Sequence, residues 1–233
     1  DPDWSRGLGD VYKRQLITGC DGYIGWPFFL KTALKNKEYK IIGVDNFGRR
    51  KWVKEVKEKS FTKIYSLNER LKELKKISKR KNFRFINLDL TNYKKTSSLI
   101  KKFKPDIIFH LAAQPSAPYA NSNPQRATYT NYNNNQSTLN MLWALKKNNL
   151  LKTIFVETTT TGVYGTPDFN INEGFNILNK NPIPFHNLGG SWYHISKSND
   201  CNYLWLANRL WGLTVIDFRT AITLGLNLSL IHI

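Results

Sequence analysis

Short apolar runs alternate with helix-length segments along most of this 233-residue chain, and this alternation restricts the fold more than any other feature. The apolar runs are continuous, which is typical of strands that are buried on both faces of a parallel sheet. We therefore predict a doubly wound, Rossmann-like α/β fold with helices on both faces of the sheet. The predicted strands lie at 16–18, 41–44, 83–88, 107–111, 153–156 and 213–218, and the predicted helices at 23–35, 125–147 and 192–210.

Two segments interrupt this alternation. Residues 47–81 are more than a single crossover helix requires, and residues 166–190 are rich in Asn, Pro and Gly. Long irregular segments at the carboxyl edge of such a sheet tend to form binding loops. The sequence has no internal repeat and no low-complexity linker, so we expect residues 16–227 to form one domain with an insertion at 47–81.

Both ends of the chain are expected to be foreign to the gene. Codons for residues 10–15 (Asp-Val-Tyr-Lys-Arg-Gln) can be chosen so that their reverse complement encodes residues 228–233 (Leu-Ser-Leu-Ile-His-Ile). An inverted repeat that bounds an open reading frame resembles a translated sequencing adapter of the transposase type. We therefore expect residues 1–15 to be a non-native leader and residues 228–233 a non-native tail, without a part in function.

The formal net charge of +18 is of the kind found in proteins that bind nucleic acid or another anion. The lysines are spread over helix faces without interleaved base-stacking aromatics, so we predict solvated surfaces and no nucleic-acid partner; a favourable field for anionic nucleotide substrates is the alternative. No apolar run approaches the roughly 18–20 residues of a membrane span, and no membrane partner is predicted. Cys20 and Cys201 are the two cysteines, so neither a disulfide framework nor a metal site is predicted, and a reducing cytoplasm is the simplest setting.

Three glycines with the spacing G-x-x-G-x-x-G follow the first predicted strand and open a helix. Without side chains, the backbone there can turn tightly and approach a pyrophosphate at the helix N-terminus, where unpaired N–H groups point outward. This loop predicts a dinucleotide site. Its candidate contacts are Gly19, Gly22, Tyr23, Ile24 and Gly25.

A carboxylate, Asp45, ends the second predicted strand. At this place it can accept hydrogen bonds from an adenosine ribose diol and repel a 2′-phosphate, which favours NAD over NADP. Arg49 and Arg50 lie nearby and act against that preference. Asp89 and Leu90 follow the third predicted strand, where they either contact the adenine or form an ordinary turn.

Tyr193 and Lys197 are four residues apart near the start of a predicted helix, so both lie on one face. A cationic lysine lowers the cost of ionising a phenol, and a tyrosinate can act as general base on a sugar hydroxyl. Thr160 follows the preceding predicted strand and is the candidate for a third hydroxyl beside the substrate oxygen. The neighbouring Thr158 and Thr159 are explained by β-propensity alone.

These cues occur in the order found in the extended short-chain dehydrogenase/reductases, and residues 16–225 resemble that family. Within it, the chain is most similar to the UDP-sulfoquinovose synthases. The insertion is the most discriminating part, because general epimerases lack it. The segments that carry the resemblance are 22–26 (Gly-Tyr-Ile-Gly-Trp), 44–46 with 49–50, 60–66 (Ser-Phe-Thr-Lys-Ile-Tyr-Ser) with Arg70, 114–119, 164–167, 172–174 and 192–197 (Trp-Tyr-His-Ile-Ser-Lys).

The resemblance implies an NAD-dependent enzyme that acts on a nucleotide sugar, with UDP-glucose as substrate. It implies oxidation at C4, loss of the C6 hydroxyl, addition of sulfite at C6 and return of the hydride to C4. It also implies a homodimer of the full-length protein through the helices at 125–147 and 192–210. The implied catalytic residues are Thr160, Tyr193 and Lys197. Further implied cofactor contacts are Asn46, Arg49, Leu111, Ala112, Ala113, Asn134, Tyr193 and Lys197, and implied substrate contacts are Gln114, Ser116, Thr160, Thr161 and His194.

Two positions depart from that resemblance and keep alternatives open. Pro115 stands where the family has an arginine, and Val163 where it has an acidic residue. The run 112–116 (Ala-Ala-Gln-Pro-Ser) also looks like nucleotide-sugar 2-epimerases of the CDP-tyvelose type, so an epimerase or dehydratase is the second hypothesis. A non-catalytic nucleotide-binding module is the third, disfavoured by the intact catalytic residues. Because the family's C-terminal substrate part is absent, we expect this fragment to bind NAD at best and not to turn over substrate alone.

Overall fold

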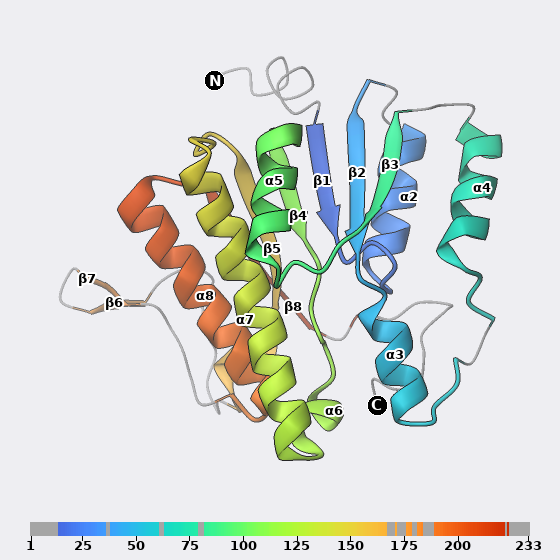
Figure 1. The fold of residues 1–233 in the computed structure, drawn as a ribbon. Coiled ribbons are helices and arrows are strands. Elements are labelled where there is room, and N and C mark those ends of the chain that lie inside the picture. Colours follow the sequence, from blue (N-terminus) through green and yellow to red (C-terminus); the bar gives the residue numbers. More distant parts are fainter. Residues whose placement is uncertain are drawn as a thin grey trace.

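The computed structural model describes residues 14–35, 38–60, 63–78, 82–166, 171, 176–178, 181–183, 189–221 and 223. Within them, six parallel strands form a sheet in the order β3-β2-β1-β4-β5-β8, beside a separate two-stranded hairpin (Figure 1). The strand order reverses direction between β1 and β4, so the predicted doubly wound fold is confirmed. The strands are β1 (Arg14–Thr18), β2 (Lys40–Asp45), β3 (Phe83–Asn87), β4 (Ile107–His110), β5 (Ile154–Thr160) and β8 (Val215–Thr220), with β6 (Asn176–Leu178) and β7 (Asn181–Ile183) in the hairpin.

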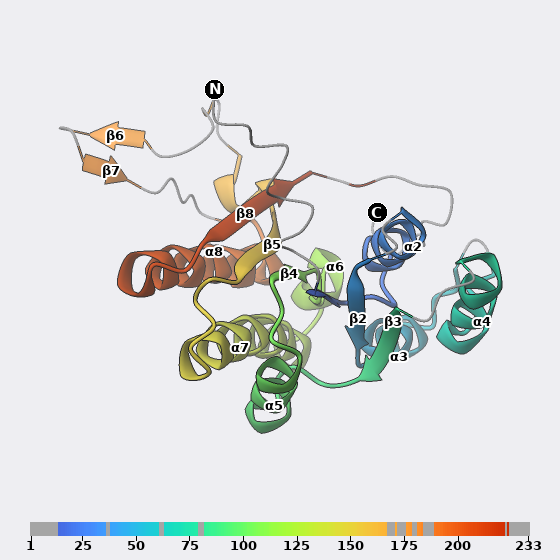
Figure 2. The same ribbon diagram turned by 90° about the horizontal axis from the view of Figure 1, so that it is seen from above.

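Helices cover both faces of the sheet. Figure 2 shows α5, α7 and α8 on one face and α2 on the other, while Figure 1 shows α3 and α6 beyond the carboxyl ends of the strands. The helices are α2 (Gly25–Lys35), α3 (Gly48–Glu55), α4 (Leu67–Ser78), α5 (Tyr93–Phe103), α6 (Ala117–Asn121), α7 (Pro124–Lys147) and α8 (Trp192–Trp211), and a 3-10 turn, η1, spans Thr161–Tyr164. No helix in the described part of the chain combines the length and the apolar character needed to cross a bilayer.

Each face of the sheet has its own hydrophobic core. Successive strand side chains point to opposite faces, so Leu16 packs toward α5, α7 and α8, whereas Ile17 packs toward α2 and α4. Both side chains are completely buried. Burial of an aliphatic side chain of this size contributes roughly 1.5–3 kcal/mol, which explains why continuous apolar strands require helices on both sides.

The two long helices have well-defined beginnings. Asn123 and Ser191 precede α7 and α8, and their side-chain oxygens accept hydrogen bonds from backbone N–H groups in the first helical turn. On these helices, Leu142 and Leu204 are each 1% exposed and face the sheet, whereas Trp143 is 44% exposed and makes an edge-to-face contact with Trp211. The helices therefore use one face for the core and leave an aromatic pair on the other.

Helix α5 was not predicted, because its composition is mostly polar. Asn92 caps its first turn by accepting from the Lys95 N–H at 3.1 Å, and Lys104 ends it in a left-handed conformation with φ of 49°. Only Thr96 and Ile100 are fully buried in this helix. A narrow apolar stripe with a good cap is thus sufficient when a sheet is available to pack against.

Several element boundaries differ from the predicted ones. β5 continues through the threonine run to Thr160, and α2 begins at Gly25 instead of residue 23 because the glycine loop occupies the residues before it. The insertion contains α3 and α4, and residues 166–190 contain the β6–β7 hairpin. Arg14 and Gln15, which fall in the expected non-native leader, pair with Lys40 and Ile41 of β2. Residues 1–13 and 228–233, the rest of the expected foreign ends, lie outside the described residues.

Candidate active site

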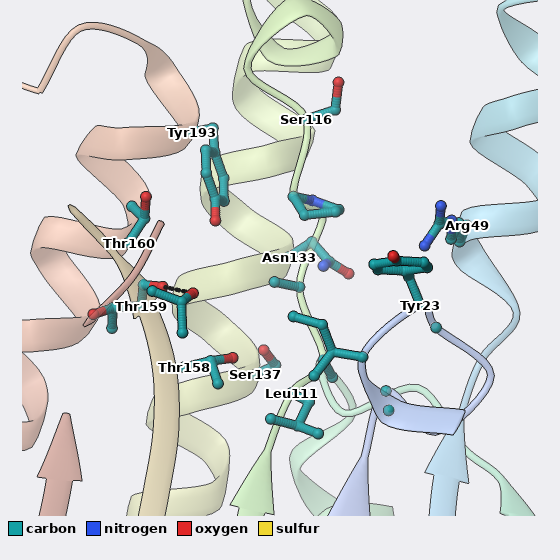
Figure 3. A pocket seen from close by; sticks show the side chains of 18 of the residues that line it. Tyr23, Arg49, Leu111, Ser116, Asn133, Ser137, Thr158, Thr159, Thr160 and Tyr193 are labelled. Atoms are coloured by element: carbon teal, nitrogen blue, oxygen red, sulfur yellow. Dashed lines mark hydrogen bonds between the residues drawn. The ribbon is translucent and has the colours of Figure 1, made fainter. Parts of the chain in front are cut away.

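A crevice of about 510 Å³ opens at the carboxyl ends of the strands, beside the point where the strand order reverses. Its walls come from the glycine loop, the ends of β2, β4 and β5, and the first turn of α8 (Figure 3). Open α/β sheets bind ligands at this position, because loops from strands that diverge in opposite directions leave a gap there. The lining is mixed, with glycines at one end and hydroxyl groups at the other.

The glycine loop is so tight that two of its glycines have no room for a side chain. Gly19 has φ of 68°, and a Cβ atom there would lie 2.6 Å from the carbonyl oxygen of Leu111. A Cβ atom on Gly25 would lie 2.0 Å from the carbonyl oxygen of Gly19. The loop is closed by a hydrogen bond from the Gly22 N–H to that same Gly19 oxygen at 3.0 Å. The backbone can therefore reach an anion at the N-terminus of α2.

Asp45, at the end of β2, is fixed in the crevice wall by the backbone. Its two carboxylate oxygens accept from the Asp21 N–H at 2.8 Å and from the Phe47 N–H at 2.7 Å. Burial raises the pKa of Asp45, and these two hydrogen bonds work in the opposite direction. Each oxygen keeps lone-pair capacity toward the crevice, so the carboxylate remains able to accept from a diol.

The nearby arginines have different surroundings. Arg50 donates to the Asp21 carboxylate from Nε at 2.7 Å and from a terminal nitrogen at 2.9 Å, and Arg70 donates to the same carboxylate. Arg70 also lies over the ring of Trp26, 4.4 Å from its centroid. The Asp21 carboxylate thus balances the positive charges of Arg50 and Arg70, which the insertion places next to the glycine loop. Arg49 instead lines the crevice beside Tyr23 (Figure 3).

Tyr193 and Thr160 both line the opposite end of the crevice. The Tyr193 side chain projects from the first turn of α8 toward the end of β5, where Thr160 lies (Figure 3). The Thr160 hydroxyl oxygen accepts from the Gly162 N–H at 3.1 Å, which leaves its proton available for donation. Burial raises the pKa of Tyr193, the Lys197 ammonium opposes this, and the carboxylates of Asp200 and Glu157 add to it.

Lys197 does not line the crevice but is buried in the interior, one helical turn after Tyr193, whose phenol it influences electrostatically. Its ammonium group, 2% exposed, donates to Glu157 Oε1 at 2.5 Å and to Asp200 Oδ2 at 2.8 Å. Burial by itself lowers the pKa of Lys197, but the two carboxylates outweigh it and raise the pKa above its ordinary value. The lysine is therefore charged throughout the neutral range.

His194 borders the crevice next to Tyr193. A Cβ atom on Gly162 would lie 2.4 Å from the imidazole ring, so this glycine makes room for the histidine. Partial burial lowers the pKa of His194, and the ring is neutral at pH 7. Its Nδ1 atom is buried and has no hydrogen-bond partner within the described residues.

Most of the predicted site residues share this one crevice. Three do not line it: besides Lys197, Gln114 and Asn134 are buried and bonded to each other, from the Gln114 N–H to Asn134 Oδ1 at 2.7 Å and from Asn134 Nδ2 to the Gln114 carbonyl at 3.1 Å. The predicted residues that line the crevice are Gly19, Gly22, Tyr23, Ile24, Gly25, Asp45, Asn46, Arg49, Asp89, Leu90, Leu111, Ala112, Ala113, Ser116, Thr160, Thr161, Tyr193 and His194.

Sequence reasoning missed three charged residues that support the site. Asp21 holds two arginines, and Glu157 and Asp200 hold Lys197. A glutamate inside the apolar run of β5 and an aspartate three residues after Lys197 were visible signals. A charge in a fully buried strand requires a partner, so Glu157 in particular pointed to a buried cation.

Comparison with known proteins identifies the relatives of this chain. The family described as GDP-mannose 4,6 dehydratase matches residues 16–183. A UDP-sulfoquinovose synthase of Sulfolobus acidocaldarius is 37% identical over 210 residues, which are 88% of this chain and 52% of that protein. The chloroplastic UDP-sulfoquinovose synthase of Spinacia oleracea is 31% identical over 217 residues, 91% of this chain and 44% of that protein. The chain thus spans about half the length of these relatives.

A solved structure gives the same result for the fold. The Bordetella bronchiseptica enzyme WbmH, in complex with NAD⁺, matches with a TM-score of 0.57 and 26% identity over 90% of this chain and 56% of that protein.

Proposed function

Since this chain belongs to the GDP-mannose 4,6 dehydratase family, within the extended short-chain dehydrogenase/reductases, we propose that it is the NAD-binding part of an enzyme that transiently oxidises C4 of a UDP-sugar. We further propose that the whole enzyme is a UDP-sulfoquinovose synthase. The observation that carries the proposal is one crevice with the glycine loop and Asp45 at one end and Tyr193 with Thr160 at the other. A dinucleotide that lay along the crevice from the glycine loop would bring its far end toward these two hydroxyl groups.

The residues present fit NAD. The loop has glycines where a Cβ atom would collide with backbone, which is the requirement for close approach to a pyrophosphate. Asp45 stands where a ribose diol would lie, and its charge disfavours a 2′-phosphate. Arg50 is already paired with the Asp21 carboxylate, which weakens the electrostatic attraction between this arginine and a 2′-phosphate. When bound, NAD⁺ would supply a hydride acceptor.

The protein's own groups would handle the proton and the orientation of the sugar. Tyr193, as phenolate, would accept the proton of the C4 hydroxyl, and Thr160 would donate a hydrogen bond to the same oxygen. Lys197 favours the ionised phenol through its charge. Tyr193 is half-buried in the crevice wall, which limits the access of water to its phenol.

A binding experiment on the purified chain tests the cofactor proposal. We expect calorimetric titration to give an NAD dissociation constant at least about tenfold lower than that for NADP, equivalent to roughly 1.4 kcal/mol. Asp45→Ala should remove most of this discrimination, because it deletes the carboxylate that repels the 2′-phosphate. Equal affinity of the unaltered chain for both cofactors would contradict the assignment of Asp45.

The full-length protein is needed to test the reaction. With NAD⁺, UDP-glucose and sulfite, we expect a sulfonated nucleotide sugar, and Tyr193→Phe should lower its formation by about 10² to 10⁴-fold. Lys101→Met, an exposed position on α5, serves as the matched control. Turnover that survives Tyr193→Phe would refute the proposed role of the phenol.

A nucleotide-sugar epimerase or dehydratase is the second candidate, and two observations favour it. Val163 is completely buried and supplies no acid or base at the position where the sulfoquinovose synthases have an acidic residue. Pro115 lines the crevice where those enzymes have an arginine, so this position supplies no cation for an anion such as sulfite. A sulfite-independent epimer or dehydrated sugar in the same assay would establish this alternative.

The proposal extends to assembly. Trp143, Leu206 and Leu210 leave exposed apolar surface on the outer faces of α7 and α8, which supports pairing of these helices between two copies of the full-length protein. Ultracentrifugation of that protein should then give a dimer. The double variant Trp143→Ser with Leu210→Ser should give a monomer.

The insertion should contribute to cofactor affinity through Arg70. This side chain joins α4 to Asp21 inside the glycine loop, so Arg70→Met releases the loop from its support. We expect about tenfold weaker NAD binding by calorimetry, roughly 1.4 kcal/mol. Lys72→Met is the control, because it lies exposed on the same helix. If Arg70→Met leaves the dissociation constant at the control value, the insertion has no role in holding the loop.

A further inference from the structure

An ionic cluster of three side chains, Lys197, Glu157 and Asp200, lies close enough to Tyr193 to interact with its phenol electrostatically. Glu157 of β5 and Asp200 of α8 both accept hydrogen bonds from the ammonium of Lys197, at 2.5 and 2.8 Å. The two carboxylates are completely buried, and Lys197 is 2% exposed. Two of the three N–H groups of the lysine are therefore used by carboxylates on the side away from the crevice.

The surroundings of the cluster are polar, and the nearby titratable groups in the described part of the chain are neutral: burial and the Asp200 carboxylate raise the pKa of the Tyr203 phenol. From α7, Asn135 donates to Asp200 at 2.9 Å and Thr138 donates to Glu157 at 3.2 Å. From β4, His110 is buried and accepts at Nδ1 from the Thr18 hydroxyl at 2.9 Å, since that hydroxyl oxygen already accepts from two backbone N–H groups. Burial lowers the pKa of His110 to about 3, so this ring is neutral.

The charges of the cluster do not cancel when every group is ionised. Two carboxylates and one ammonium leave one negative charge in a region without solvent, which is costly unless a proton is taken up. Burial raises the pKa of Asp200 to about 7, although the Lys197 ammonium and two hydrogen bonds oppose this rise. At neutral pH Asp200 is therefore near its titration midpoint and takes up a proton as the pH falls.

We propose that Glu157 and Asp200 are positioning residues for Tyr193: they hold the Lys197 ammonium within electrostatic reach of the phenol and determine how much of its charge the phenol experiences. The carboxylate pair offsets the lysine when it is fully ionised and exposes the lysine charge when it takes up a proton. The inference rests on the proposed role of Tyr193 as the base and adds two residues to that site. It makes the ionisation of Tyr193 dependent on groups that do not touch the crevice.

The test measures the ionisation of Tyr193 directly, in the chain as it exists and without cofactor. Carbon-13 labelling of the tyrosine Cζ atoms gives a resonance that moves when the phenol ionises, and Tyr193→Phe identifies the signal. In Glu157→Gln the titration midpoint should fall by about one unit or more, because one opposing negative charge is lost. Asp200→Asn should shift it in the same direction, and Lys197→Met in the opposite direction.

Glu73→Gln is the matched control, because that glutamate is exposed on α4 and pairs with Lys76. It should leave the Tyr193 midpoint unchanged. Folding of each variant is checked by circular dichroism, and Asp200→Asn replaces Glu157→Gln if the latter does not fold. A midpoint that stays within about 0.2 units of the unaltered chain in the folded carboxylate variants overturns the inference.

This readout separates the inference from the proposed function. If the midpoint shifts as expected but the chain does not bind NAD, the positioning of Tyr193 stands and the cofactor proposal fails. If NAD binds but the midpoint does not move, the carboxylates are merely structural.

Discussion

Replacement of Gly25 by alanine is expected to abolish NAD binding by this chain. The added Cβ atom would lie 2.0 Å from the Gly19 carbonyl oxygen and 2.9 Å from the Cα atom of Cys20, and both are backbone atoms that no side-chain rotation can move. The loop must therefore open, and the N–H groups at the start of α2 lose their common direction. We expect the dissociation constant to rise more than about 100-fold, roughly 2.7 kcal/mol or more, in calorimetric titration.

Gly190→Ala is the control for this substitution. Gly190 lies beside the same site and is exposed, and a Cβ atom there would meet its nearest neighbour at 4.0 Å, an ordinary contact. The Gly190→Ala protein should bind NAD with the same affinity as the unaltered chain. Thermal unfolding monitored by circular dichroism verifies that Gly25→Ala still contains the folded sheet. Preserved affinity in the folded Gly25→Ala protein would disprove the assignment of the loop to the pyrophosphate.

Lys197→Met is expected to lower the free energy of unfolding by about 3–5 kcal/mol at pH 8. The substitution leaves the carboxylates of Glu157 and Asp200 buried without their cation. The loss should be smaller at pH 5, because Asp200, whose pKa is raised to about 7, gains stability when it is protonated. Urea denaturation at the two pH values measures both effects.

The direction of this pH dependence follows from the pKa of Asp200 in the unaltered chain. Its pKa is raised to about 7 from an ordinary value of 3.8, so the folded state binds a proton that the unfolded state releases between these values. The contribution of this group to stability is therefore complete below about pH 4 and is lost as the pH rises through about 7. In the Lys197→Met protein more stability is lost as the pH rises, because the two carboxylates then repel each other with no ammonium between them.

Glu157→Gln provides the opposite case for the same cluster. It leaves one carboxylate for one ammonium, so we expect unfolding free energies within about 1 kcal/mol of the unaltered chain at pH 8. Lys101→Met, on the exposed side of α5, controls for the loss of a lysine as such. A Lys197→Met protein as stable as the Lys101→Met protein would mean that the cluster does not need its cation.

Much of the fold could be predicted from local patterns of apolar and polar residues in the sequence. The continuous apolar strands required helices on both faces, and all six strands of the sheet were placed within a few residues. The misses have physical causes: α5 has only a narrow apolar stripe, and the end of β5 consists of polar threonines that a parallel neighbour, β8, holds in extended form. Neither α5 nor the end of β5 is specified without the element that it packs or pairs with.

The sequence alone determined the features that depend on backbone chemistry and on chain order. A strand, a glycine turn and a helix N-terminus fix the loop at Gly19–Gly25, the end of β2 fixes Asp45, and helical spacing places Tyr193 one turn before Lys197. Only the tertiary structure decided where the long polar side chains point. Lys197 turns to Glu157, which is 40 positions away, and Asp21 receives Arg70, which is 49 positions away. Such pairs form because a buried charge must find its counter-charge wherever packing brings one, and that neighbour is set by the assembled sheet and helices, not by spacing along the chain.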